Sequence, residues 1–239
     1  MIRFQYRLWG IMILTVGNIK GGVGKSTLAC NIACALSFQS KGGGVLLIDG
    51  DKQGSAADFA QSRADLLGEA GFTCVRAQGK EVVNQVVTMR DKFAHIVIDA
   101  GGQDNPSLRA GLAVSDKVLV PVAPRSFETW ALEGMAALIE EASITNAKLE
   151  AFAVLNLAFP RGSDNTQTQD IIREDYPRLT LIEPPIVQRK AFSDGAGQGL
   201  SVLELKPRNP DAIAELIGLL GGLGVNQNDI KVIYNVRAA

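Results

Sequence analysis

Between an apolar run at Met12–Val16 and a helix-like run that begins at Ser26 stands the segment Gly17-Asn18-Ile19-Lys20-Gly21-Gly22-Val23-Gly24-Lys25-Ser26-Thr27. Its glycines let backbone N–H groups approach an anion closely, and the N-terminus of the following helix adds a favourable dipole. Two lysines among four glycines have no packing rationale in a strand-to-helix turn. The segment therefore predicts a phosphate-binding loop of the Walker A type.

Short apolar runs alternate with helix-like segments along the rest of the chain. The predicted strands are Met12–Val16, Val45–Ile48, Ile96–Ile98, Lys117–Val122 and Ala151–Asn156. The predicted helices are Ser26–Ser40, Ala56–Leu67, Lys80–Met89, Ser107–Val114, Thr129–Ile144, Asn165–Tyr176 and Ala212–Leu220. Strands that are apolar throughout are buried on both faces. We therefore expect the α/β class: a doubly wound, mostly parallel sheet with helices on both faces, as in P-loop NTPases.

The length and composition favour one globular domain. The chain has 239 residues, of which 46% are hydrophobic and 21% charged, which argues against disorder and against a coiled coil. The 24 basic and 25 acidic residues give a net charge of −1, so any nucleic-acid site must be a local patch. We expect an N-terminal extension at 1–11, the ATPase-like domain at 12–225 and a C-terminal tail at 226–239.

The N-terminus and the cysteines bear on the cellular compartment. Basic and aromatic residues precede the apolar run, but the run is too short to span a bilayer and leads into the glycine loop, so we expect no signal peptide. Cys30, Cys34 and Cys74 are too few for a disulfide framework. A reducing, cytoplasmic setting is the simplest expectation.

The loop itself has a specific order of residues. Lys25 is placed to reach the β- and γ-phosphates, the Ser26 hydroxyl to bind Mg²⁺, and Thr27 to contact the α-phosphate. The general pattern asks for a glycine at the position of Ile19, and a second lysine, Lys20, stands at the start of the loop.

The octapeptide K-G-G-V-G-K-S-T resembles the deviant Walker A loop of the ParA/MinD superfamily of ATPases, and the resemblance extends over roughly residues 12–220. In that superfamily the extra lysine reaches the phosphates of the partner in a nucleotide-sandwich homodimer, as an arginine finger does. The resemblance implies ATP and Mg²⁺ as cofactors and Lys20 and Lys25 as catalytic residues. It implies nucleotide binding by Gly21, Gly22, Val23, Gly24, Lys25, Ser26 and Thr27.

Three aspartates close predicted strands at the carboxyl edge of the sheet, where open α/β folds bind ligands. By the resemblance, Asp51 orients the attacking water, Asp49 lies close to the metal, and Asp99 is the Walker B residue that holds Mg²⁺ with Ser26. Lys52 stands where the family commonly has proline. Strand-capping roles for Asp49 and Asp51 are the alternative. The single histidine, His95, begins the strand at its other end and is expected to be structural.

Asn156 and Pro185 are the candidates for holding the adenine. Asn156 ends a predicted strand, and its amide could pair with the base edge. In the superfamily an asparagine and a proline-containing loop at matching places hold adenine, here Asn156 and Pro184-Pro185-Ile186. A turn-forming asparagine and an ordinary Pro-Pro turn are the alternative.

At this length we expect no added helix-turn-helix domain, so the chain resembles the short, ParF-like partition proteins. Such ATPases bind DNA non-specifically as ATP dimers and are released when an adaptor, ParB-like or of the ribbon-helix-helix class, stimulates hydrolysis. The resemblance thus implies partition of a plasmid or chromosome and a nucleoid-associated location. The candidate DNA patch is Arg189, Lys190, Lys206 and Arg208, with Arg161, Arg173 and Arg178 as weaker candidates. Solvated charge balanced by Glu174, Asp175, Glu183 and Glu204 is the alternative.

Other classes of function stay open. A MinD-like membrane ATPase needs a basic amphipathic C-terminus, to which Asp229–Ala239 is a weak match, so a membrane partner is not favoured. An iron protein needs paired cluster-bridging cysteines, which this spacing does not favour. ParA-like positioning of non-DNA cargo, such as chemotaxis clusters or carboxysomes, uses the same machinery as partition.

Overall fold

The computed structural model describes residues 12–39, 44–102, 105–124 and 129–226. The expected N-terminal extension at 1–11 and almost all of the expected tail at 226–239 lie outside these residues. No helix in the described part of the chain is both long enough and apolar enough to cross a bilayer.

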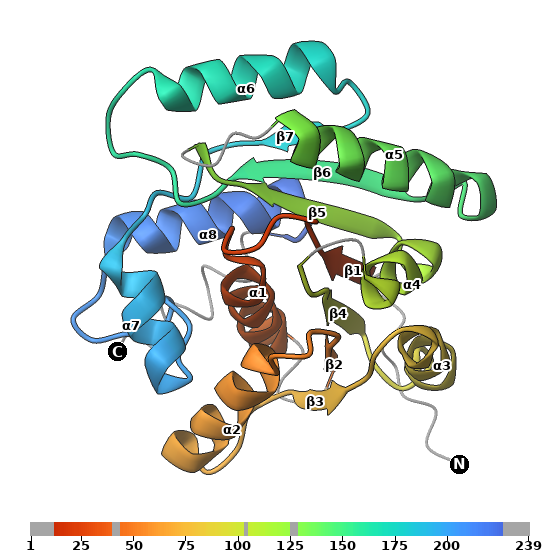
Figure 1. The fold of residues 1–239 in the computed structure, drawn as a ribbon. Helices are drawn as coiled ribbons and strands as arrows, with labels where there is room; N and C mark the ends of the chain where they lie inside the picture. The colour runs from red at the N-terminus through yellow and green to blue at the C-terminus, as the bar shows by residue number, and fades with distance from the viewer. Residues whose placement is uncertain (1–11, 40–43, 103–104, 125–128, 227–239) are drawn as a thin grey trace.

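The structure alternates strands and helices in the order expected of a doubly wound fold (Figure 1). The strands are β1 (Met12–Val16), β2 (Val45–Asp49), β3 (Thr73–Arg76), β4 (His95–Asp99), β5 (Lys117–Val122), β6 (Glu150–Leu155) and β7 (Thr180–Ile182). The helices are α1 (Lys25–Gln39), α2 (Ser55–Leu67), α3 (Lys80–Met89), α4 (Pro106–Val114), α5 (Thr129–Thr145), α6 (Asp164–Asp175), α7 (Lys190–Gln198) and α8 (Pro210–Gly222).

The strands form one sheet in the order β3-β2-β4-β1-β5-β6-β7, and every neighbouring pair is parallel. The chain moves outward from β1 to β2 and β3 on one side and later to β5, β6 and β7 on the other. All carboxyl strand ends therefore meet at one edge. The register aligns Val16, Asp99 and Asp49 across three adjacent strands, β1, β4 and β2.

Helices cover both faces of the sheet (Figure 1). On one face α1, α2, α7 and α8 pack against alternate strand residues such as Leu14, Leu47 and Val97. On the other face α3 and α4 cover β1, β2 and β4, while α4, α5 and α6 cover β5 and β6. Because each central strand contributes apolar side chains to both faces, the doubly wound parallel sheet expected from the sequence is confirmed.

The structure adds three elements that the sequence did not predict. β3 is a short edge strand whose two end residues are exposed and whose two central residues are half-buried, so it lacks a buried apolar run. β7 is only three residues long. Helix α7 contains Gly195 and Gly197, which lower helix propensity, and it is held by the packing of Phe192 and by a close approach of Gly195 to the carbonyl of Leu200.

Candidate functional site

The glycine loop lies at the carboxyl edge of the sheet, between β1 and α1. Gly22 and Gly24 adopt φ of 74° and 84°, a left-handed conformation that favours glycine. Gly21 and Gly22 are exposed, and a Cβ added at either would meet no atom within 4 Å. The loop thus presents backbone next to a helix N-terminus with room for a phosphate chain.

Lys25 lies across this loop. Its side chain is only 7% exposed, and its Nζ donates a hydrogen bond of 2.9 Å to the carbonyl of Lys20. Burial lowers the pKa of Lys25, while Asp99 and Asp51 act in the opposite direction. A buried cation that interacts with two carboxylates beside an anion-binding loop can neutralise phosphate charge.

Asp99, the last residue of β4, carries the clearest signature of a metal site. It is fully buried, and neither carboxylate oxygen has a hydrogen-bond partner within the described chain. Burial raises its pKa to about 7; the neighbouring Ser26 hydroxyl lowers the pKa, Asp49 raises it, and Lys25 lowers it. A buried carboxylate with unsatisfied oxygens, next to a hydroxyl and a phosphate loop, fits a hard divalent cation.

Mg²⁺ would therefore be held by Asp99 and Ser26, and when bound it would neutralise charge on the phosphates. No cluster of three or more His, Cys, Asp or Glu side chains able to hold a metal occurs among the described residues. Phosphate oxygens and water would have to complete the coordination of Mg²⁺, which commonly keeps several waters.

Asp49 and Asp51 occupy different positions in the loop after β2. Both oxygens of the fully buried Asp49 accept backbone N–H groups, Oδ1 from Asp51 at 3.1 Å and Oδ2 from Ala57 at 2.8 Å. Burial raises the pKa of Asp49, and these two hydrogen bonds lower it. Asp49 therefore holds the loop and the start of α2, which fits a supporting role near the metal; the metal role itself stays a prediction.

Asp51 is half-buried and faces the loop after β4. A Cβ on Gly101 would lie 3.2 Å from the carboxylate carbon of Asp51, and one on Gly102 would lie 3.5 Å from Nζ of Lys25. The β2–α2 and β4–α4 loops thus meet above the glycine loop. Asp51 therefore lies where these loops meet; its role in orienting water stays a prediction.

Asn156 lies against the glycine loop, and Pro185 lies in the segment that pairs with the end of β6. Nδ2 of Asn156 donates to the carbonyl of Val23 at 2.7 Å, so the side chain is fixed against the loop. The segment that follows Pro185 pairs with the end of β6, where Ile186 N donates to the carbonyl of Leu155 at 2.8 Å. Asn156 therefore borders the glycine loop from the β6 side. The role of Asn156 and Pro185 in holding adenine stays a prediction.

Arg189, a candidate for the DNA patch, is engaged in ion pairs within the protein. Its Nε and Nη2 donate to Oε1 of Glu215, at 3.0 and 2.7 Å, and Nη1 lies 3.1 Å from Asp211. Glu215 is nearly buried in α8, and the hydrogen bonds to it raise the pKa of Arg189. Arg189 therefore pairs with two carboxylates and joins the start of α7 to α8; its role in the DNA patch stays a prediction.

The other predicted patch residues lie on or near α7. Lys190 begins the helix and is 87% exposed, with Asp194 as a distant ion-pair partner at 3.8 Å. Lys206 is exposed and Arg208 half-buried in the segment between α7 and α8. Glu204, which could have balanced them, pairs instead with Arg63 at 2.6 Å. The DNA role of Lys190, Lys206 and Arg208 stays a prediction.

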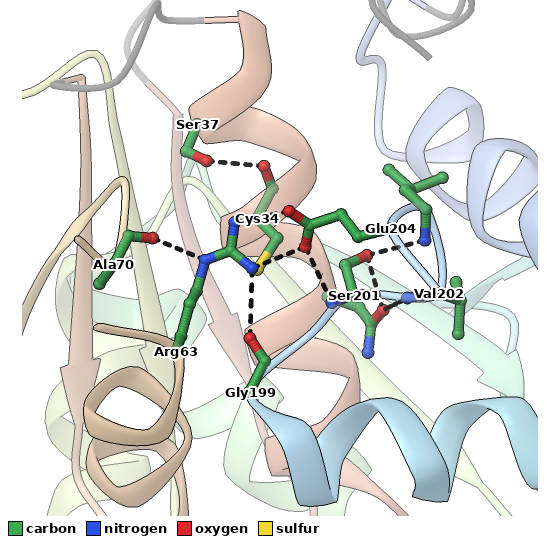
Figure 2. A network of polar contacts seen from close by, with 10 residues as sticks. Cys34, Ser37, Arg63, Ala70, Gly199, Ser201, Val202 and Glu204 are labelled. Carbon is green, nitrogen blue, oxygen red and sulfur yellow. Dashed lines mark hydrogen bonds and ion pairs between the residues drawn. The ribbon is translucent and has the colours of Figure 1, made fainter. Parts of the chain in front are cut away.

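Figure 2 shows a buried polar network around Arg63 that sequence reasoning missed. Arg63 of α2 is 3% exposed and donates from Nη1 and Nη2 to the two oxygens of Glu204, at 2.6 and 2.8 Å. Arg63 also donates to the carbonyls of Ala70 and Gly199. A buried arginine gives no sequence signal, since arginine is usually exposed.

The same network reaches α1 through Asn31. Oδ1 of Asn31 accepts from the Ser201 hydroxyl at 2.9 Å and from Val202 N at 3.0 Å, and its Nδ2 donates to the carbonyl of Thr27. Ser201 N donates in turn to Glu204. The network therefore ties the first turn of α1 to α2 and to the segment after α7.

His95 lies at the amino end of β4, at the opposite edge of the sheet. Burial lowers its pKa to about 4, so it is neutral at physiological pH. Its distance from the glycine loop agrees with the structural role expected from the sequence.

Comparison with known proteins places the chain in a family. A family model described as the CobQ/CobB/MinD/ParA nucleotide binding domain matches residues 14–202. The "Maintenance of carboxysome distribution protein A" of Halothiobacillus neapolitanus is 29% identical over 212 residues, which cover 87% of this chain and 94% of the relative. The "Chromosome-partitioning ATPase Soj" of Thermus thermophilus is 32% identical over 153 residues, which cover 53% of this chain and 59% of the relative.

A solved structure agrees on the fold. An ATP complex of a Cyanothece McdA variant superposes with a TM-score of 0.73 over 91% of this chain and 97% of that chain, at 15% identity. The family match, the full-length relative and the parallel sheet with its glycine loop agree, and the chain belongs to the CobQ/CobB/MinD/ParA family of nucleotide-binding domains, as a ParA/MinD-type ATPase.

Proposed function

We propose that the protein is a Mg²⁺-dependent ATPase that works as a positioning switch: it pairs into a homodimer with ATP, binds DNA non-specifically in that state, and is released when an adaptor stimulates hydrolysis. The single observation that carries this proposal is the glycine loop, with Lys20 at its start and the buried Lys25 and Asp99 next to it.

The charges around the loop support a site built for a polyphosphate and a cation. Asp99 has unsatisfied oxygens for Mg²⁺, and Lys25 supplies positive charge. Asp51 lies near the glycine loop and would orient the attacking water. A cation that arrives from a second protomer, Lys20, would stabilise charge that develops in the transition state, so hydrolysis would depend on dimerisation.

The first cargo we propose is a plasmid or chromosome region, held through a ParB-like or ribbon-helix-helix adaptor. The similarity to Soj supports it. A second cargo is a protein body, since the carboxysome distribution protein matches 94% of its own length. In both cases the exposed Lys190 and Lys206 would contact phosphates of nucleoid DNA.

The decisive experiment measures the ATPase rate of the protein alone, with non-specific duplex DNA, and with anionic liposomes. We expect slow turnover alone and ATP-dependent co-sedimentation with DNA. ATP-dependent binding to liposomes without binding to DNA would favour the MinD-like alternative.

Lys20→Ala tests the sandwich mechanism. The variant should bind ATP normally and lose stimulated hydrolysis by about 10³-fold, as when an arginine finger is removed. Lys92→Ala is the matched control, because Lys92 is an exposed lysine just before the amino end of β4. Normal stimulated turnover in Lys20→Ala would overturn the mechanism.

Reversal of charge at Lys190 and Lys206 tests the DNA patch. The double variant to glutamate should weaken DNA binding in the ATP state. It should also make the dependence of log K on log salt shallower, by about 0.9 for each DNA phosphate that the protein no longer neutralises. The ATPase rate without DNA should not change. Unaltered DNA affinity would remove this surface from the proposal.

A further inference from the structure

Asn18 lies two residues before the first lysine of the loop and is 3% exposed. Its Nδ2 donates to the carbonyl of Pro121 in β5 at 2.8 Å, and its Oδ1 accepts the backbone N–H of Lys20 at 2.9 Å. One buried side chain thus joins the central sheet to the backbone of Lys20.

The first hydrogen bond explains how β1 ends. The last backbone bond of β1 toward β5 runs from Gly17 N to the carbonyl of Leu119, at 3.0 Å. In a parallel ladder the next acceptor on the same side is two residues on, at Pro121. The Asn18 amide occupies that acceptor in place of the backbone N–H of Ile19. The chain can therefore leave the sheet at this point without an unsatisfied carbonyl.

The second hydrogen bond makes an Asx-type turn that fixes the direction of the chain at Lys20. The carbonyl of Lys20 is held as well, since it accepts from Nζ of Lys25 at 2.9 Å. Both polar groups of the Lys20 backbone are thus fixed, one by Asn18 and one by Lys25.

Ile19 adds an apolar anchor between these two residues. Its side chain packs against the α4–α5–α6 side of the core, and a Cβ on Gly134 of α5 would lie 2.5 Å from its Cδ1. Gly134 therefore leaves the space that Ile19 fills. The departure from the general pattern, isoleucine in place of glycine, has a structural use, because it fastens the entry of the loop to α5.

We propose that Asn18 is the positioning residue for Lys20, with the contact between Ile19 and Gly134 as its apolar counterpart. Together they fix the backbone from which the Lys20 side chain leaves the loop. This inference rests on the proposed function, in which Lys20 acts on the phosphates of the partner protomer. A displacement of about 1 Å at such a group can cost about 10²-fold in rate without loss of substrate binding.

The test is a double-mutant cycle between Asn18→Ala and Lys20→Ala, read as kcat and KM of DNA-stimulated hydrolysis and as ATP-dependent dimerisation. Asn18→Ala should lower kcat by about tenfold or more with KM nearly unchanged. In the double variant the loss should equal that of Lys20→Ala alone, because the two residues act as one unit. Additive losses would overturn the proposal.

Asn146→Ala is the matched control for general destabilisation. Asn146 is also buried, and its Nδ2 donates to the carbonyls of Leu112 and Ser115, near the opposite end of β5. Its loss should lower thermal stability and leave kcat unchanged. An equal loss of kcat in both variants would assign Asn18 a merely structural role. If Asn18→Ala does not fold, Asn18→Asp keeps the acceptor for Lys20 N–H and takes its place in the cycle.

A rescue pair tests the apolar anchor separately. Gly134→Ala places a methyl group against Cδ1 of Ile19, so it should lower kcat. Ile19→Val removes that atom and should restore kcat in the double variant. Failure of this rescue, with a normal cycle at Asn18, would remove the Ile19 contact from the proposal. Normal hydrolysis by Lys20→Ala alone would overturn the proposed function instead, so the two failures are distinguishable.

Discussion

Two buried charged groups near α1 are treated differently by the fold. Asp99, at the carboxyl edge of the sheet, is fully buried with no hydrogen-bond partner for its carboxylate within the described residues. Arg63, in the network of Figure 2, is 3% exposed and donates to Ala70, Gly199 and both oxygens of Glu204.

The difference separates a binding site from a scaffold. A buried charge without partners is costly in the protein alone, and the cost is removed when a cation binds. A buried charge whose hydrogen bonds are complete holds elements in place. By this criterion the burial of Asp99 supports the metal-binding role proposed above, and the Arg63–Glu204 pair keeps α2 and the segment after α7 fixed relative to α1.

The largest expected effect comes from removing Glu204 from the network of Figure 2. Glu204→Ala leaves Arg63 buried without its carboxylate, and we expect a loss of about 3–5 kcal/mol in the free energy of unfolding, measured by urea denaturation. The double variant Arg63→Met/Glu204→Met removes both charges and should recover part of this loss. A single variant as stable as the wild type would mean that Arg63 reaches solvent when Glu204 is absent.

The next prediction is a gain in stability when Asp99, at the carboxyl edge of the sheet, loses its charge. The pKa of Asp99 rises from 3.8 to about 7 on folding, so the folded state binds the proton more tightly than the unfolded chain. Stability is therefore lost as pH rises from about 4 to about 7, by about 4 kcal/mol in total. Asp99→Asn should recover part of this at pH 8. The gain is less than the full value because Lys25 loses a favourable neighbour.

Urea denaturation of Asp99→Asn and the wild type without nucleotide, at pH 4 and pH 8, checks this prediction. The two proteins should have similar stability at pH 4, and the variant should be more stable at pH 8. The added stability that Mg²⁺ and ATP give the wild type should be absent in the variant. A variant less stable than the wild type at pH 8 would contradict an unsatisfied carboxylate at this position.

The sequence predicts the carboxyl edge of the sheet well because glycines, lysines and strand-terminal aspartates are recognisable from local order. Lys25, Asp49 and Asp99 all lie at the strand edge where the pattern places them. The five apolar strands are also predicted well, because a continuous run of apolar residues indicates burial on both faces of the sheet.

The scaffold could not be predicted, because its residues have no local signature. Arg63 and Glu204 are 141 positions apart and look like surface charges. Sequence reasoning missed the pairing of Arg189 with Glu215 for the same reason, since this pairing depends on how α7 meets α8. Long-range pairing of charges follows from the tertiary fold, and one sequence does not specify it.

A smaller effect sharpens the view of the scaffold. Ser201→Ala removes the buried hydrogen bond from its hydroxyl to Oδ1 of Asn31, which still accepts from Val202 N. It also removes the longer hydrogen bond, of 3.3 Å, that the hydroxyl accepts from Leu203 N. We expect a loss of about 1 kcal/mol in the free energy of unfolding, with the ATP affinity unchanged. A change in ATP affinity, measured by nucleotide titration, would show instead that the network influences the first turn of α1 and the phosphate site.

The smallest expected effect comes from an ion pair that has contact distances similar to those of Arg63–Glu204 but is exposed to solvent. Nη1 of Arg109 contacts both oxygens of Glu141, at 2.9 and 2.8 Å, distances similar to those of the Arg63–Glu204 pair. Both side chains are well exposed, at 45% and 63%, so solvent screens their attraction and hydrates either one alone. Glu141→Ala should therefore cost at most about 1 kcal/mol, against about 3–5 for Glu204→Ala, in the same urea experiment. Equal losses would mean that contact geometry, and not burial, decides how strongly an ion pair holds this fold, and the distinction drawn between Asp99 and Arg63 would lose its physical basis.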